Sequence, residues 1–212
     1  VSEWGEGTKK GSGIKIPKSF YEPTKNLPPL LQSQRNGGNK VWNMDKAFKN
    51  EQLWRNYIGA YYALVTEIDH CVGEILNALE EADLEEETSV IYTSDHGDFV
   101  GNHGMVEKAA AGQNVYEDIL NIPLIIRFPG KTKNGKRTAE LVTLADVLPT
   151  LIEMLDLKVP DLKYPIQGES MADIITKNGS MNRDYLISES WSQAAVITQN
   201  SKLGIMLDPT VV

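Results

Sequence analysis

An aspartate and a histidine stand side by side, Asp95 and His96, directly after an apolar run of strand length. In open α/β sheets, ligands bind beyond the carboxyl ends of strands, which is where these two residues are placed. Their carboxylate and imidazole can both reach one cation if the chain turns sharply, and Gly97 permits such a turn. Two such donors suit a divalent ion but leave its coordination incomplete. The pair predicts part of a metal site; taken alone, a turn aspartate and a hydrogen-bonded loop histidine explain the same residues.

The same loop carries a lysine and a second histidine. Lys108 brings a compact positive charge, which suits an anionic ester. His103 lies between Gly101 and Gly104, two glycines that keep the loop backbone close to its surroundings. We interpret His103 as a residue that contacts the site residues without touching the substrate, with a purely structural loop residue as the alternative.

Two strands and a long helix must position this loop. The β-branched run at 88–94 and the apolar run at 122–128 are typical of strands covered on both faces. Before them, apolar residues recur at three- and four-residue spacing from about 46 to 82, which predicts a long amphipathic helix. On this helix His70 falls on the polar face and should be exposed, whereas Cys71 beside the apolar stripe should be a small buried residue.

The remaining elements follow the second strand. Helical spacing over 143–155 begins with Thr143 and Asp146, which can form a capping box. A short apolar run at 185–188 predicts a strand, and 196–207 predicts a hairpin. Helices and strands in this order indicate an α/β layer with a small β appendix.

Composition excludes several classes of protein. With 41% hydrophobic and 24% charged residues, the chain is typical of a soluble globular domain. A net charge of -8 argues against a nucleic-acid surface, and no apolar stretch reaches the roughly 18 residues of a membrane span. A single cysteine forms no internal disulfide. The polar, glycine-rich opening at Val1 indicates the middle of a longer protein.

The wider string closely resembles the sulfatase family of the alkaline-phosphatase superfamily. The resemblance covers about 15–207 in unbroken order. It rests on Thr93–Asp98, Gly101–Gly104, Lys108, Tyr116–Glu117 and Ile122–Gly130, with further similarity at 61–76, Leu144–Leu151 and Gln167–Ser170.

The resemblance implies an α/β fold, a sulfatase-like sheet flanked by helices and incomplete in this chain. Residues 1–180 would be the carboxy-terminal portion of the catalytic domain, and 181–212 the start of a small β subdomain. The first portion would comprise an irregular arm over 1–45, rich in glycine and proline, the helix at about 46–82 and the site loop at 94–118.

The resemblance also implies roles. Asp95 and His96 would be metal ligands, usually for calcium and sometimes for magnesium, and Lys108 would contact the sulfate oxygens. The family's formylglycine arises in a Cys/Ser-x-Pro-x-Arg motif, which Cys71 does not open, so we expect it in a missing amino-terminal half. The stretch 109–114 is longer than the family's commonest form.

The parent enzyme is therefore expected to hydrolyse sulfate esters of a small molecule or glycan, with this chain inactive alone. The alternatives are a phosphonate monoester or phosphodiester hydrolase of the same superfamily, and a non-catalytic sulfatase fragment. The missing half or a second copy of the chain is the expected partner, with nucleic acid excluded. A periplasmic or secreted location would fit the family.

Overall fold

The computed structural model describes residues 13–27, 29, 31–33, 35, 50–109, 114–132, 135–177, 179–190 and 193–206. The helices and strands in these ranges are α3 (Glu51–Glu81), β1 (Val90–Thr93), α4 (Glu117–Leu120), β2 (Leu124–Arg127), α5 (Val147–Met154), α6 (Ala172–Lys177), β3 (Leu186–Ser190), β4 (Gln193–Ile197) and β5 (Lys202–Met206). Four short 3-10 turns accompany them: η1 (Lys18–Tyr21), η2 (Thr24–Asn26), η3 (Asn102–Gly104) and η4 (Leu144–Asp146).

The long helix is confirmed, but it begins later than expected. The Asn50 side chain accepts a hydrogen bond from the Leu53 backbone N–H at 3.3 Å and caps α3, so the helix starts at Glu51. Residues 46–49 lie outside the described part of the chain. His70 is exposed, as predicted, with Nε2 3.5 Å from a carboxylate oxygen of Glu74.

Cys71 is exposed, so its prediction as a buried residue is wrong. Burial on α3 is confined to the first turns, at Trp54, Ile58 and Gly59. There Trp54 packs edge-on against Phe20, with ring centroids 4.9 Å apart, which docks the arm on the helix. Further along the helix Leu64, Ile68 and Ile75 are exposed, and Cys71 lies in that part.

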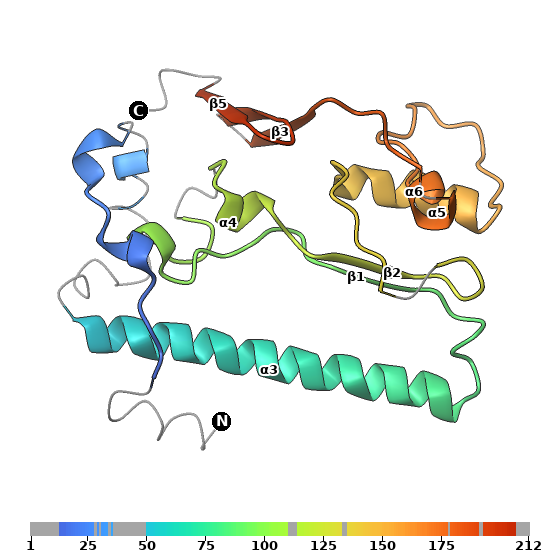
Figure 1. Ribbon diagram of the computed structural model, residues 1–212, viewed down its shortest axis with the longest axis horizontal. Coiled ribbons are helices and arrows are strands. Elements are labelled where there is room, and N and C mark those ends of the chain that lie inside the picture. Colours follow the sequence, from blue (N-terminus) through green and yellow to red (C-terminus); the bar gives the residue numbers. More distant parts are fainter. Residues whose placement is uncertain are drawn as a thin grey trace.

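The strands β1 and β2 form an antiparallel pair, in which Val90 lies opposite Arg127 and Thr93 opposite Leu124. Helix α3 runs along one side of this pair, while α5 and α6 lie on the other side (Figure 1). Ile126 packs toward α5 and α6, but its neighbour Ile125 points to the other face and is 64% exposed. Within the described residues one face of the pair is therefore covered and the other is open, and the cover expected on the second face stays a prediction.

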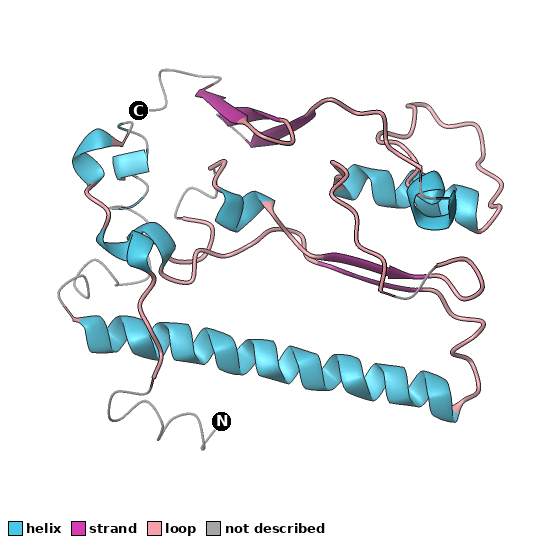
Figure 2. Ribbon diagram, viewed as in Figure 1, coloured by secondary structure: helices cyan, strands magenta, loops and turns pink. Residues whose placement is uncertain are grey.

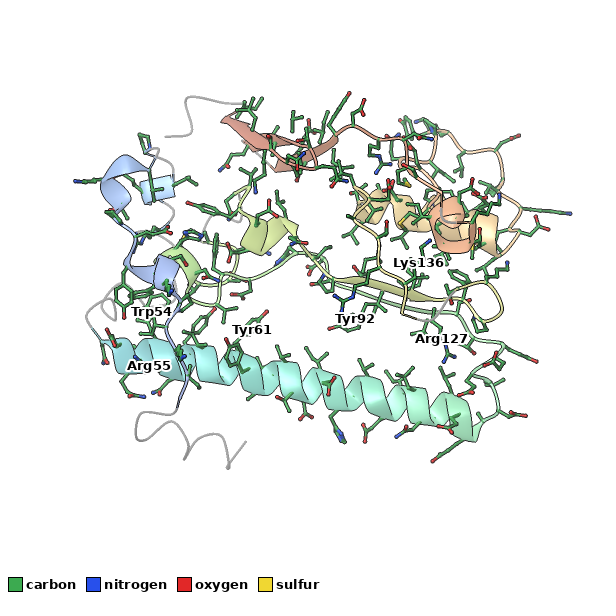
Figure 3. All side chains as sticks on the ribbon, viewed as in Figure 1. Trp54, Arg55, Tyr61, Tyr92, Arg127 and Lys136 are labelled. Carbon is green, nitrogen blue, oxygen red and sulfur yellow. The ribbon has the colours of Figure 1, made fainter. Side chains whose placement is uncertain are left out.

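The opposite face of the pair looks toward α3. Tyr61 from α3 and Tyr92 from β1 point into the space between the helix and the strands (Figure 3). Tyr92 is 40% exposed, because the described side chains do not fill this space. The face of β1 and β2 toward α5 and α6 is therefore packed, and the face toward α3 is open.

The predicted hairpin is confirmed and belongs to a second antiparallel sheet, in the order β3-β4-β5. Figure 2 shows this sheet above α4 and the β1–β2 pair. The helix at 143–155 is also confirmed as η4 followed by α5. The short helices α4 and α6 were not predicted. The division of the chain at about residue 180 stays a prediction.

A buried ion pair joins the start of α5 to the segment before β3. The predicted capping box between Thr143 and Asp146 is present, and the fully buried Asp146 carboxylate also accepts two hydrogen bonds from Arg183, at 2.7 and 2.9 Å. Burial alone raises the pKa of Asp146, but the bonds from Arg183 and from the backbone N–H groups of Glu169 and Thr143 outweigh it and lower the pKa. The carboxylate is therefore held charged by partners that belong to separate segments.

Candidate functional site

The residues singled out by type and spacing meet beyond the end of β1. Asp95, His96 and Lys108 line one cavity of about 1130 Å³, whose far wall includes residues of β3 and the β4–β5 turn. Asp95 follows the last residue of β1, Thr93, by two positions. Asp95 and Lys108 thus face the same side of the sheet.

Gly97 explains why the chain turns sharply after the aspartate and histidine. Its backbone N–H donates to the Ile119 carbonyl at 2.9 Å. A Cβ atom at this position would lie 1.9 Å from the Asp118 carbonyl oxygen, which no real side chain tolerates. Glycine at this position therefore lets the segment ending in α4 press against the loop and fixes the direction of the two preceding side chains.

The His96 ring is oriented by the next residue. Its Nδ1 lies 2.8 Å from the Gly97 carbonyl oxygen, so Nδ1 carries the hydrogen and donates to that oxygen. The Nε2 atom then holds the lone pair, and it faces Asp95 Oδ2 at 3.4 Å and Lys108 Nζ at 3.0 Å. A backbone carbonyl that fixes the tautomer in this way is a common support for a metal-binding histidine.

Asp95 exposes its carboxylate to the cavity and also accepts a hydrogen bond from the backbone of the next residue. Its side chain is 83% exposed, and Oδ1 accepts a hydrogen bond from the His96 backbone N–H at 2.9 Å. That hydrogen bond is the main reason why the pKa of Asp95 lies below its ordinary value. The group is therefore an anion at neutral pH, as a cation ligand must be.

Lys108 stands on an unusual piece of backbone. Its neighbours Glu107 and Ala109 both have left-handed φ angles, 52° and 67°, which are costly for residues other than glycine. The segment is held from outside: the Phe99 N–H donates to the Glu107 carbonyl at 2.8 Å, and the Asn114 side-chain amide donates to the Lys108 carbonyl at 2.8 Å. This conformation projects the lysine into the cavity.

Sequence analysis missed three residues that shape this site. Asn114 is 3% exposed and lies at the end of the long stretch 109–114, of which 110–113 fall outside the described residues. Tyr57 and Asp98 hydrogen-bond to each other beneath the loop. The helical pattern included Tyr57 only as an apolar position. Asp98 and Asn114 lie in segments that the sequence marked, Thr93–Asp98 and 109–114, but nothing there gave either residue a role.

His103 does not line the cavity that holds Asp95, His96 and Lys108. Its Nδ1 lies 2.8 Å from Glu22 in the arm, and its Nε2 lies 3.5 Å from Asp118. The ring also stacks at a tilt on Tyr116, with centroids 4.5 Å apart. Because Asp118 contacts Gly97 through its backbone, His103 touches the site only through another residue, and its supporting role stays a prediction.

The donor set is suitable for a divalent cation but incomplete. Asp95 offers carboxylate oxygens and His96 offers an imidazole lone pair, at a mutual distance that a single ion can bridge. No group of three or more His, Cys, Asp or Glu side chains that could hold a metal gathers within the described ranges. Further ligands would have to come from outside the described ranges.

Among the described helices, none is long and apolar enough to cross a membrane.

Comparison with known proteins gives one consistent result. The sulfatase family model matches residues 17–157. An arylsulfatase of Clostridium perfringens is 32% identical over 190 residues, which are 84% of this chain and 38% of that protein. The structure of a 2-O GAG sulfatase superposes with a TM-score of 0.74 at 26% identity, covering 90% of this chain and 42% of that one.

A phosphonate monoester hydrolase of Agrobacterium radiobacter shares the fold as well, with a TM-score of 0.64 at 22% identity over 74% of this chain and 34% of that chain. The chain thus spans between 34% and 42% of the length of these three proteins.

Proposed function

Since this chain belongs to the sulfatase family, we propose that the whole protein hydrolyses sulfate esters and that this chain supplies part of its metal and sulfate site. The observation that carries the proposal is the convergence of Asp95, His96 and Lys108 on one cavity, within the matched region. The site combines a carboxylate, an imidazole lone pair and an ammonium group. Together these groups suit a cation bound beside an anionic ester.

As a family, sulfatases use a divalent metal and a formylglycine. We assign Asp95 and His96 Nε2 as ligands of the metal, calcium first and magnesium as the alternative. Both are hard cations that bind carboxylate oxygens, and calcium accepts a flexible and irregular ligand set. When bound, the ion would withdraw charge from the sulfuryl oxygens. The part of the protein outside this chain would provide the remaining ligands.

Lys108 is proposed to contact the sulfate oxygens. Its ammonium group lies 3.0 Å from His96 Nε2, beside the point at which Asp95 and His96 converge. A metal ion on Nε2 would use the lone pair that the ammonium group now contacts, and the ammonium group would then be available to the ester oxygens. A positive charge fixed there is attracted more strongly as negative charge grows on the ester oxygens, which is how such groups accelerate ester hydrolysis.

The nucleophile is proposed to lie outside this chain. The only cysteine, Cys71, is followed by Val72, Gly73, Glu74 and Ile75 instead of the Pro-x-Arg pattern of the family. It stands exposed on α3 and is not among the residues that line the cavity. The chain alone therefore lacks the group that must attack sulfur.

The substrate class is proposed to be a sulfated small molecule or a sulfated glycan. The support comes from relatives whose names include an arylsulfatase and a 2-O GAG sulfatase. The phosphonate monoester hydrolase supports only the fold at its level of identity, so phosphonate hydrolysis remains the competing outcome of the test.

The first prediction is that the whole protein cleaves an aryl sulfate and sulfated glucosamine faster than an aryl phosphonate, and that a chelator stops the reaction. The isolated chain should show no turnover above buffer under the same conditions. Product release would be measured for both proteins, with calcium or magnesium restored after chelation. A whole protein that prefers the phosphonate, or an isolated chain that cleaves the sulfate, would contradict the proposal.

A second prediction concerns the partner of this chain. Uncovered apolar side chains lie on several elements, among them α3, β2, β3 and β5, and include Leu64, Ile75, Ile125, Ile187 and Leu203. Burying apolar area is favourable by roughly 25 cal/mol per Å², and exposed strand edges pair readily. We propose that the rest of the whole protein covers them.

Light scattering after size exclusion tests this proposal. The whole protein should be monodisperse, and the isolated chain should associate with itself or aggregate. An isolated chain that stays monomeric and melts cooperatively would show that the open faces need no partner.

A further inference from the structure

Tyr57 on α3 reaches both sides of the site loop with one hydroxyl group. The hydroxyl donates to Asp98 Oδ1 at 3.2 Å and accepts from the Glu107 backbone N–H at 3.2 Å. Asp98 stands two residues after His96, and Glu107 directly precedes Lys108. The hydroxyl oxygen therefore bridges the segment that carries the metal-ligand candidate and the segment that carries the sulfate-contact candidate, beside the backbone bond from the Phe99 N–H to the Glu107 carbonyl.

The loop between these two segments contains backbone conformations that are unfavourable for the residues that adopt them. Val100 and His103 have left-handed φ angles of 47° and 53°, and this conformation is unfavourable for a β-branched valine. The Asp98 carboxylate restrains Val100 by accepting its backbone N–H at 2.8 Å. Strained residues of this kind persist only where surrounding contacts impose them. The contacts made by the Tyr57 hydroxyl are among those that impose this geometry.

The chemistry of the partners suits a permanent link. Burial raises the pKa of Tyr57 well above its ordinary value, so the hydroxyl keeps the hydrogen that it donates. The half-buried Asp98 carboxylate uses Oδ1 for both the Tyr57 hydroxyl and the Val100 backbone N–H. The Tyr57 ring packs edge-on against Trp54 with centroids 6.1 Å apart, so packing holds the ring independently of the hydroxyl.

We propose that Tyr57 is a positioning residue of the sulfate site, whose hydroxyl sets the separation between His96 and Lys108. The inference rests on the proposed function and names the residue that adjusts its geometry. Without the hydroxyl, the Glu107 N–H loses this acceptor and Asp98 loses a donor. The Phe99 N–H still donates to the Glu107 carbonyl, but the side-chain bridge is gone, so the 3.0 Å approach of Lys108 to His96 is held less tightly.

The test is Tyr57→Phe in the whole protein, which keeps the packed ring and removes the oxygen. We expect kcat for an aryl sulfate to fall about 10- to 100-fold, the range typical of losing a residue that orients a metal ligand. The calcium concentration that gives half of the metal-induced rise in Tm should increase about tenfold, a readout that does not depend on turnover. Tyr62→Phe, which alters an exposed tyrosine on the same helix, is the matched control and should change neither quantity.

Asp98 variants separate positioning from general destabilisation. Asp98→Asn keeps an oxygen that can accept from Tyr57, so most of the activity should remain, whereas Asp98→Ala should lose activity like Tyr57→Phe. Both changes remove the Tyr57–Asp98 hydrogen bond, and Asp98→Ala also removes the acceptor of the Val100 N–H, so the double variant Tyr57→Phe with Asp98→Ala should be little worse than Asp98→Ala alone. If Tyr57→Phe fails to fold, the comparison of the two Asp98 variants carries the test.

Two outcomes overturn the inference. One is a Tyr57→Phe protein with the kcat and calcium dependence of the unchanged protein, and the other is full additivity in the double variant. Failure of the proposed function looks different, because the unchanged protein would then cleave no sulfate ester. The calcium-dependent Tm shift would still report whether Tyr57 positions the site.

Discussion

Replacing Asp95 with alanine in the whole protein is expected to abolish metal-dependent turnover. The side chain is 83% exposed in this chain and its bonds stay within the loop, so its loss leaves the packed clusters untouched. The Asp95 carboxylate is, however, one of the two ligands from this chain that we assign to the metal. Removing a direct ligand should weaken metal binding by more than about 100-fold, the upper range for residues that only support a ligand.

Calcium titration followed by initial rate and by Tm measures this effect. The Asp95→Ala protein should keep the Tm that the unchanged protein shows in chelator, and calcium at the concentrations that saturate the unchanged protein should no longer raise it. Asp69→Ala, which removes an exposed carboxylate of α3, serves as the control for charge alone. Near-normal activity of Asp95→Ala at ordinary calcium concentrations would remove Asp95 from the metal site.

Replacing Lys108 with alanine is expected to lower kcat by about 10²- to 10³-fold, the usual loss when one donor to a developing anion is removed. The cause is the loss of positive charge at the ester oxygens, not a change in the fold, because the segment is held through its backbone by Asn114 and Phe99. Lys108→Arg should recover only part of the rate, since a planar guanidinium cannot occupy the position of a compact ammonium group.

Excess metal distinguishes the two variants. High calcium should partly restore Asp95→Ala, because weak binding can be overcome by concentration, but should leave Lys108→Ala unchanged. Lys158→Ala, at an exposed lysine beyond α5, is the control for net charge. A Lys108→Ala protein that regains full kcat at high calcium would place the lysine in metal binding instead of sulfate contact.

Local patterns were sufficient for the elements whose cause is local. The three- and four-residue spacing predicted α3, and the Thr143 and Asp146 pair predicted the capping box, because both depend on neighbours within one or two helical turns. The β-hairpin was predicted for the same reason, since β4 and β5 are joined by a short polar turn. The start of α3 was misplaced because Asn50, not an earlier residue, supplies the cap.

Burial was predicted less well, because it depends on what covers an element. Cys71 lies beside the apolar stripe and Ile125 is in an apolar strand, yet both are exposed in the described chain. Periodicity identifies the face that favours burial, but the covering surface must come from other segments. The cavity residue Asn114 was missed because its polar side chain is satisfied only by the folded loop around Lys108.

The sequence by itself determined the family resemblance and the long helix, and it marked Asp95, His96 and Lys108 as the residues that we propose for a metal and sulfate site. Only the tertiary structure brought Lys108 within 3.0 Å of His96, turned His103 toward Glu22 and Asp118 and away from the cavity, and put the Tyr57 hydroxyl between the two halves of the loop. The physical reason is distance along the chain. Residue type and short spacing are local properties, whereas a contact between α3 and a loop 41 or 50 residues later exists only after the chain has folded.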